Sequence, residues 1–200
     1  MLEKGGPREN RFGSKQEKAL PPQQVQSFLR KLREDSGTNT SRLALEFMIL
    51  TVAHMKQVIG ARFSEFDLAG EVWIIPAAQT KTGRAFKMPL SPRAVAVVER
   101  AREIDWDRNF VFPGRKANKP LSAMTFPMMF RRMQVDATAE GFRSSFRAWA
   151  VERTDFGSEI TEMALEQSAG STCPSDDLFE TYRQLMNTCA AFLHSTPTDA

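Results

Sequence analysis

Cysteine, histidine and tyrosine are scarce in this sequence: its 200 residues include two cysteines, two histidines and one tyrosine. The cysteines, Cys173 and Cys189, form no Cys-x-x-Cys pair. Disulfide frameworks and structural zinc sites need more of these residues at closer spacing, so we expect neither a disulfide nor a metal site, and no cofactor. Two thiols without a disulfide pattern are typical of a reducing cytoplasm, where we expect this protein.

A long apolar run is also missing from the first part of the chain. Residues 1–18 are polar and rich in glycine, which predicts neither a signal peptide nor a membrane span. We expect residues 1–18 to be a flexible tail, residues 19–194 to form one domain, and residues 195–200 to be a disordered tail.

The composition that remains is that of a folded domain with a weakly basic surface. Hydrophobic residues make up 42% of the chain, including 15 phenylalanines and 10 methionines, while 26% are charged and the mean hydropathy is −0.37. Basic residues number 27 and acidic residues 24, which gives a net charge of +3 and a pI of about 9.0. This balance is compatible with a polyanionic partner but does not require one.

Apolar residues three and four positions apart predict that most of the chain is helical. The period changes to two at residues 71–75 and 85–88, which predicts two strands joined through a turn at 79–84, and residues 110–112 resemble a further short strand. We therefore expect a mainly α fold with a small antiparallel β-sheet. Helices are expected at residues 22–34, 43–58, 92–101, 122–133, 141–152, 158–168 and 176–193.

Two of these helices have unusual sequences. Residues 43–58 are apolar on nearly every face, which favours a position at the centre of the domain. Pro127 falls inside the helix predicted at 122–133, where an interior proline would cost about 3 kcal/mol. That helix is therefore expected either to begin after Ser122 or to be kinked.

Five short groups of residues narrow the possible folds. Together, and in this order, they resemble the catalytic domain of tyrosine recombinases of the phage-integrase type over roughly residues 19–193, and the resemblance implies the fold of that domain. The groups are LEFMILT at 45–51, VIGAR at 58–62 with EFDL at 65–68, KTGR at 81–84 with PLSPR at 89–93, GFRSSFR at 141–147, and DLF at 177–179 with RQLM at 183–186.

The resemblance implies a particular chemistry. In that family a tyrosine attacks a DNA phosphodiester, two arginines and a histidine hold the phosphoryl oxygens, and a hairpin lysine protonates the leaving oxygen. A guanidinium fork suits this task because it donates two parallel hydrogen bonds to an oxyanion. Two of these positions are retained, the second arginine as Arg143 and the lysine as Lys81.

Three other family positions are substituted. His54 stands in place of the first arginine, and a neutral imidazole has one donor and no fork. Glu140 replaces the histidine three residues before Arg143; it would repel a phosphate, and it is expected either to pair with Arg143 or to lie on the surface. Gln167 replaces the later histidine and cannot donate a proton. The resemblance thus implies a degenerate active site.

The nucleophile is missing from its family position, because residues 170–177 are shortened and contain no tyrosine. Tyr182, the only tyrosine, lies further along on the predicted last helix. We expect it to be a packing residue with its hydroxyl at the surface. The alternative is that Tyr182 is a displaced nucleophile that reaches the DNA by a different backbone path.

Three functions remain open. We favour a relative of the integrases that binds double-stranded DNA without cleaving it; the alternatives are an active recombinase that uses Tyr182, and a truncated remnant or protein-interaction module that self-associates through its last helix. Without an upstream DNA-binding domain we expect weak binding, on the order of 10⁻⁴ to 10⁻⁶ M. The candidate phosphate contacts, each of which can instead be a solvated surface charge, are Lys81, Arg115, Lys116, Lys119, Arg131, Arg132, Arg143 and Arg147.

Overall fold

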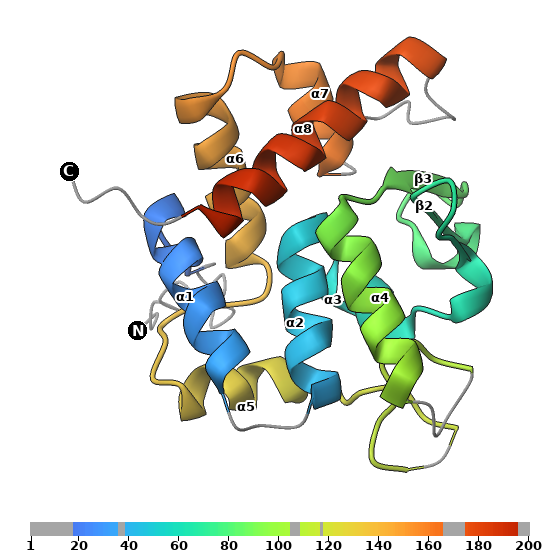
Figure 1. Cartoon of the computed structure of the whole chain (residues 1–200), viewed down its shortest axis with the longest axis vertical. Coiled ribbons are helices and arrows are strands. Elements are labelled where there is room, and N and C mark those ends of the chain that lie inside the picture. Colours follow the sequence, from blue (N-terminus) through green and yellow to red (C-terminus); the bar gives the residue numbers. More distant parts are fainter. Residues whose placement is uncertain (1–17, 36–38, 105–108, 117, 166–174, 196–200) are drawn as a thin grey trace, which may run out of the picture.

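Helices make up most of the computed structural model, which describes residues 18–35, 39–104, 109–116, 118–165 and 175–195 (Figure 1). The expected mainly α fold with a small antiparallel sheet is confirmed, while the tails predicted at 1–18 and 195–200 lie outside the described residues except for Lys18 and Ser195. The helices are α1 (Pro22–Glu34), α2 (Asn39–Thr51), α3 (Met55–Gly60), α4 (Pro92–Ile104), α5 (Thr125–Arg132), α6 (Gly141–Arg153), α7 (Ser158–Ala164) and α8 (Asp176–His194). The strands are β1 (Phe66–Asp67), β2 (Val72–Ile75) and β3 (Phe86–Pro89), and two short 3₁₀ turns are η1 (Phe63–Glu65) and η2 (Ala77–Gln79).

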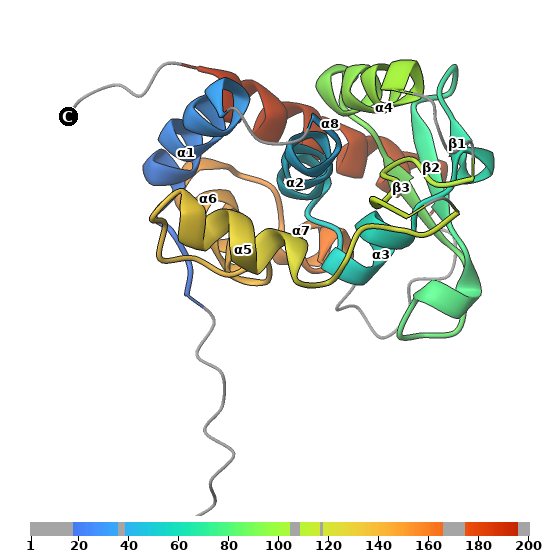
Figure 2. The same ribbon diagram turned by 90° about the horizontal axis from the view of Figure 1, so that it is seen from below.

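Helix α2 lies at the centre of the molecule, as its apolar faces predict. From Ala44 to Thr51 no residue is more than 5% exposed, and α1, α3, α4, α5 and α8 all pack against this helix. Figure 2 shows α4 and α8 on one side of α2, and α3 and α5 on the opposite side. A helix that is apolar all round needs neighbours on every face, and here it has them.

The prediction of one continuous helix over residues 43–58 is wrong. Helix α2 ends at Thr51, and Val52 takes a positive φ of 59°, which is rare for a β-branched residue and strains the backbone. The chain then runs through Ala53 and His54 into α3. The break was hidden in the sequence because Val52 and Ala53 are still core residues, each 3% exposed, so the apolar pattern continues through it.

The three strands form one antiparallel sheet in the order β1-β2-β3. Trp73 pairs with Met88 and is buried, whereas the neighbouring Ile74 is 43% exposed, so the strands alternate as predicted. The Trp73 ring stacks on Phe66 with 5.3 Å between ring centres and lies 5.4 Å from the Phe47 ring of α2. These aromatic contacts fix the hairpin to the helical part of the molecule.

The short strand predicted at residues 110–112 does not form. Val111 and Phe112 are fully buried, and the backbone N–H of Val111 donates to the carbonyl of Ala61 at 2.9 Å. The only pairing described in this region is a single bridge between Pro113 and Pro120. Proline has no N–H to donate to a ladder, which limits the pairing to this bridge.

Helix α5 begins at Thr125, later than Ser122, which confirms one of the two expectations for Pro127. Pro127 therefore lies in the first turn, where a backbone N–H has no acceptor within the helix anyway. The helix predicted at 158–168 ends earlier, because α7 stops at Ala164 with Leu165 as its C-cap; residues 166–168 lie outside the described residues. No described helix is both long and apolar enough to cross a membrane.

A buried carboxylate ties three helices together. Glu46 of α2 is 4% exposed, and its Oε1 accepts hydrogen bonds from the Nε atoms of Arg33 of α1 and Arg93 of α4, both at 3.0 Å. The two arginines are themselves partly exposed. Glu46 is therefore the member of this group that depends most on its partners, because a buried charge without a partner is costly.

The Glu46 network predicts an asymmetric loss of stability. Changing Arg33 and Arg93 together to alanine leaves a buried carboxylate unpaired and should lower the free energy of unfolding by about 3–5 kcal/mol. Glu46→Gln leaves two arginines that reach solvent and should cost about 1–3 kcal/mol. Urea unfolding followed by circular dichroism measures both, with Arg100→Ala at an exposed pair on α4 as the control. Equal losses in the two variants would contradict the proposed burial of the charge.

Candidate nucleic-acid interface

Two substituted family positions meet at the starts of two helices. His54 directly precedes α3, where its backbone N–H donates to the side-chain oxygen of Gln57 at 2.8 Å. Glu140 directly precedes α6. The break after α2 brings the His54 ring to the Glu140 carboxylate, and His54 Nδ1 lies 3.2 Å from Glu140 Oε2. The break at Val52 ends α2 and thereby places His54 at the start of α3.

Arg143 is held inside the protein by three different segments. It is 7% exposed, and its Nη1 and Nη2 donate to the backbone carbonyls of Val52 and Leu165. Its Nε lies 3.5 Å from Glu140 Oε2. Each of the three guanidinium nitrogens therefore has an acceptor within the protein. The expected pairing of Glu140 with Arg143 is confirmed, although the Glu140 side chain is also 41% exposed.

Lys81 is exposed in the turn between β2 and β3, at a place fixed by the residues before it. The side-chain amide of Gln79 donates to Glu65 at 3.0 Å, and the backbone carbonyl of Gln79 accepts from Gln57 of α3 at 3.3 Å. The Thr80 hydroxyl closes the turn, because it lies within hydrogen-bonding distance of the backbone carbonyls of Ala77, at 3.1 Å, and Arg84, at 2.7 Å. The hairpin turn is thus tied to α3, which begins next to His54.

The charges of this group act together on Glu140. The hydrogen bond from His54 is the main reason why the pKa of Glu140 lies below its ordinary value of 4.5, and the positive charges of His54, Arg143 and Lys81 act in the same direction. Partial burial opposes this shift without reversing it. Glu140 is thus a stable anion among the side chains that the resemblance assigns to phosphate binding.

Tyr182 lies away from this group. It is fully buried, its hydroxyl oxygen is buried as well, and its ring packs against Phe86 of β3 and Phe179 of α8. The expectation that its hydroxyl lies at the surface is wrong, because α8 packs this face against β3 and α2. The packing role itself agrees with the structure. Gln167 lies outside the described residues.

The predicted phosphate contacts divide into two groups. Arg132 is paired with Asp35, and Arg147 is 3.0 Å from Glu162 of α7, so both already have acidic partners. Arg131 is exposed on α5. Arg115, Lys116 and Lys119 of the 113–120 loop lie together beside α5.

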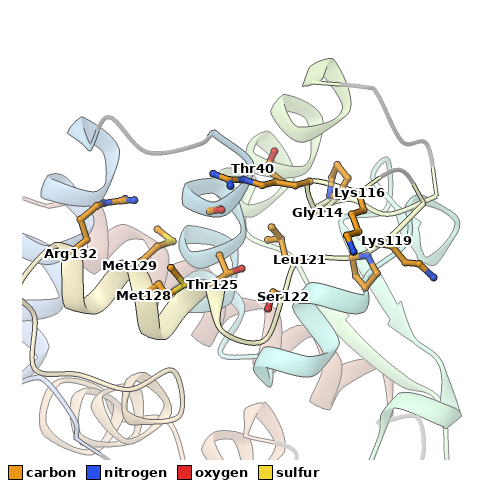
Figure 3. Close-up of a pocket in the computed structure, with 14 residues that line it drawn as sticks. Thr40, Gly114, Lys116, Lys119, Leu121, Ser122, Thr125, Met128, Met129 and Arg132 are labelled. Atoms are coloured by element: carbon orange, nitrogen blue, oxygen red, sulfur yellow. The ribbon is translucent and has the colours of Figure 1, made fainter.

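A hollow of about 610 Å³ opens between the start of α2, the 113–121 loop and α5 (Figure 3). We call it the α5 groove. Arg115, Lys116 and Lys119 line it together with Arg132, and its floor includes Leu121 and Met129. Among the described residues that line the groove there is no aspartate or glutamate. The groove therefore has a cationic rim and an apolar floor.

Sequence reasoning missed two kinds of residue here. The backbone carbonyl of Val52 accepts a hydrogen bond from Arg143, but nothing in the sequence pattern shows which backbone atoms do so. Thr40, Thr125 and Met128 line the α5 groove from segments that are far apart in the sequence. Only the exposed position of Met128, on the outer face of an amphipathic helix, was visible as a signal.

Arg143 should behave as a structural residue. Arg143→Lys removes the fork that reaches both carbonyls, so the free energy of unfolding should fall by about 2–4 kcal/mol, the cost of leaving two buried acceptors unpaired. Arg147→Lys, one turn along α6 at a partly exposed pair, should cost less than about 1 kcal/mol. Urea unfolding compares the two variants. Similar losses would show that the Arg143 contacts add nothing to stability.

Glu140 should add a pH-dependent contribution to stability. Its pKa is lowered in the folded protein, so the unfolded chain takes up a proton first as the pH falls. Wild type should be more stable than Glu140→Gln, and this difference should be fully present above about pH 4.5 and shrink at lower pH. Unfolding curves at a series of pH values test this. In a His54→Ala background the difference should be smaller, and an unchanged difference would rule out His54 as its main cause.

Sequence comparisons place these residues in a family. The model of the phage integrase family matches residues 18–155. Prophage integrase IntA of Escherichia coli (strain K12) is 29% identical over 160 residues, which are 77% of this chain and 38% of that protein. The integrase of Enterobacteria phage P4 is 29% identical over 167 residues, 75% of this chain and 38% of that protein. The chain thus spans less than two fifths of the length of these relatives.

Solved structures show the same fold. The Tn1549 transposon integrase in complex with transposon right end DNA has a TM-score of 0.60 at 16% identity, covering 86% of this chain and 66% of that one. The complex of the same integrase with a circular intermediate DNA also has a TM-score of 0.60, at 15% identity, and the match covers 88% of this chain and 67% of that one. The family model matches more than half of the sequence and the fold agrees with it, so this chain belongs to the phage integrase family of tyrosine recombinases.

Proposed function

We propose that this chain binds double-stranded DNA but does not cut it. The observation that carries the proposal is the position of Glu140, whose carboxylate contacts both His54 and Arg143. In the family these positions hold groups that neutralise a phosphate. Here the carboxylate of Glu140, an anion of the protein itself, already pairs with the side chains at two of these positions.

A phosphate at this site would meet unfavourable electrostatics. Glu140 is ionised at neutral pH, because its pKa is lowered by His54 and its other cationic neighbours. A second anion beside it would be repelled, and the Arg143 fork is directed at Val52 and Leu165 rather than at solvent. Losing one arginine that stabilises a phosphoryl transition state costs on the order of a thousandfold in rate, by analogy with other phosphoryl transfers.

The only tyrosine offers no ready replacement for the nucleophile. Tyr182 would have to leave a site in which it is 0% exposed, between Phe86 and Phe179. Moving a buried aromatic residue into solvent forfeits packing worth several kcal/mol, on the order of 3–5. An active recombinase that uses Tyr182 would therefore need α8 to separate from β3.

Binding to DNA is supported by several exposed cations, three of which line the α5 groove. Lys81, Arg115, Lys116, Lys119 and Arg131 are all exposed and are available to phosphates. Arg132 and Arg147 should contribute less, because a carboxylate already partners each of them. The Tn1549 integrase structures, which share this fold, are complexes with DNA.

The affinity of this chain alone should be modest. It spans 38% of prophage integrase IntA and 38% of the phage P4 integrase, and the affinity proposed here is that of this chain by itself. We propose a dissociation constant on the order of 10⁻⁴ to 10⁻⁶ M, the range of salt-dependent, non-specific binding. Self-association through α8 stays a prediction; α8 buries its apolar face, including Leu185 and Met186, within this chain.

Two assays on the full chain test the proposal. Incubation with supercoiled plasmid should give neither relaxation nor a covalent protein–DNA adduct. A mobility-shift assay at low ionic strength should show binding that falls steeply with added salt. In Lys116→Ala/Lys119→Ala the slope of log affinity against log salt should drop by about one per lysine. Arg153→Ala, in the last turn of α6 and far from this loop in Figure 1, should leave the slope unchanged.

Each result has a clear opposite. A covalent adduct that disappears in Tyr182→Phe would establish an active recombinase and overturn the claim of impaired cleavage. The absence of any salt-sensitive shift, with the protein folded by circular dichroism, would remove DNA binding and favour the remnant or protein-interaction alternative.

A further inference from the structure

Two exposed methionines lie beside the α5 groove. Met124 directly precedes α5 and is 54% exposed, and Met128, in the helix, is 61% exposed. Exposed large apolar side chains are uncommon in the described part of the chain, where the others are Ile74 at 43% and Val151 at 75%. Residues four apart project from the same side of a helix. The start of α5 therefore presents a small apolar ridge to solvent.

This ridge adjoins positive charge. Met128 lines the groove, and the close-up in Figure 3 shows it on α5 opposite Lys116 and Lys119 of the loop. With Arg115, these cations supply the rim, and no carboxylate lines the described groove. The occupant should therefore carry negative charges beside an apolar group.

The chemistry of duplex DNA meets both requirements. Phosphates border the major groove, which is about 12 Å wide and admits a helix. The C5-methyl group of thymine is the apolar group that a base pair presents there, and side chains contact it through their own methyl groups. An acidic protein segment could supply negative charge too, but the shared fold with integrases solved on DNA favours a duplex.

We propose that the start of α5 reads thymine in the DNA major groove, with Met124 and Met128 against the thymine methyl groups and Arg115, Lys116 and Lys119 on the flanking phosphates. This inference rests on the proposed function and adds sequence preference to it. The cations determine how tightly any duplex binds, and the methionines discriminate between base pairs.

The test removes the C5-methyl group from each thymine and changes nothing else in the duplex. Two fluorescent duplexes of the same mixed sequence are made, one with thymine and one with deoxyuridine throughout, and their affinities for the full chain are compared by anisotropy. The thymine duplex should bind about fourfold more tightly per contacted methyl group. Met124→Gln/Met128→Gln should lose this preference and keep the salt dependence. Val151→Gln, an exposed apolar residue on α6, is the matched control and should keep both.

The cation variant separates the two roles. Lys116→Ala/Lys119→Ala should weaken both duplexes equally and leave their ratio unchanged. Equal affinity of the wild-type protein for both duplexes would overturn the reading of thymine while DNA binding stands. Binding to neither duplex would overturn the proposed function itself. If the lysine variant bound both duplexes as well as wild type but lost binding to an acidic, leucine-containing peptide, the groove would be a protein-docking site and the inference would be wrong.

Discussion

The contacts of one arginine hold the candidate site together. Arg143 reaches from α6 to the carbonyl of Val52 and to that of Leu165, which follows α7, and so joins three segments that are distant in sequence. The first of these contacts falls on the strained residue that ends α2. Arg143 thus donates a hydrogen bond to each of these two carbonyls, and this stabilisation offsets the strain of the positive φ at Val52. The position of His54 follows from this break.

The same arrangement supports the proposal that this integrase fold binds DNA without cutting it. Glu140 lies where the resemblance expects a histidine, with Oε2 at 3.2 Å from Nδ1 of His54 and at 3.5 Å from Nε of Arg143. Glu140 then offsets part of the positive charge of Arg143 and Lys81, so a phosphate has less to gain there. The cations around the α5 groove are separate from these charges, because no carboxylate lines the described groove. In the proposed function, DNA binding and cleavage therefore depend on different residues.

Much of the fold follows from sequence, and the limits have physical causes. Periodicity places α1 at its observed bounds and finds the β2–β3 hairpin, because burial on one face leaves a clear pattern. It fails at Val52, where the chain breaks while the side chains stay in the core, and at residues 110–112, where the partner contains proline. The group of His54, Glu140 and Arg143 could be assembled only through the resemblance. Burial of the Tyr182 hydroxyl and the shape of the α5 groove depend on packing between remote segments, which no local pattern records.

A crystal structure of this chain with a short duplex would test the account most directly. The account predicts DNA along the α5 groove and near Lys81, with the contacts of Glu140 to His54 and Arg143 intact and Tyr182 still packed against Phe86. A backbone phosphate bound to Arg143, with Glu140 displaced and the Tyr182 hydroxyl turned toward phosphorus, would contradict it.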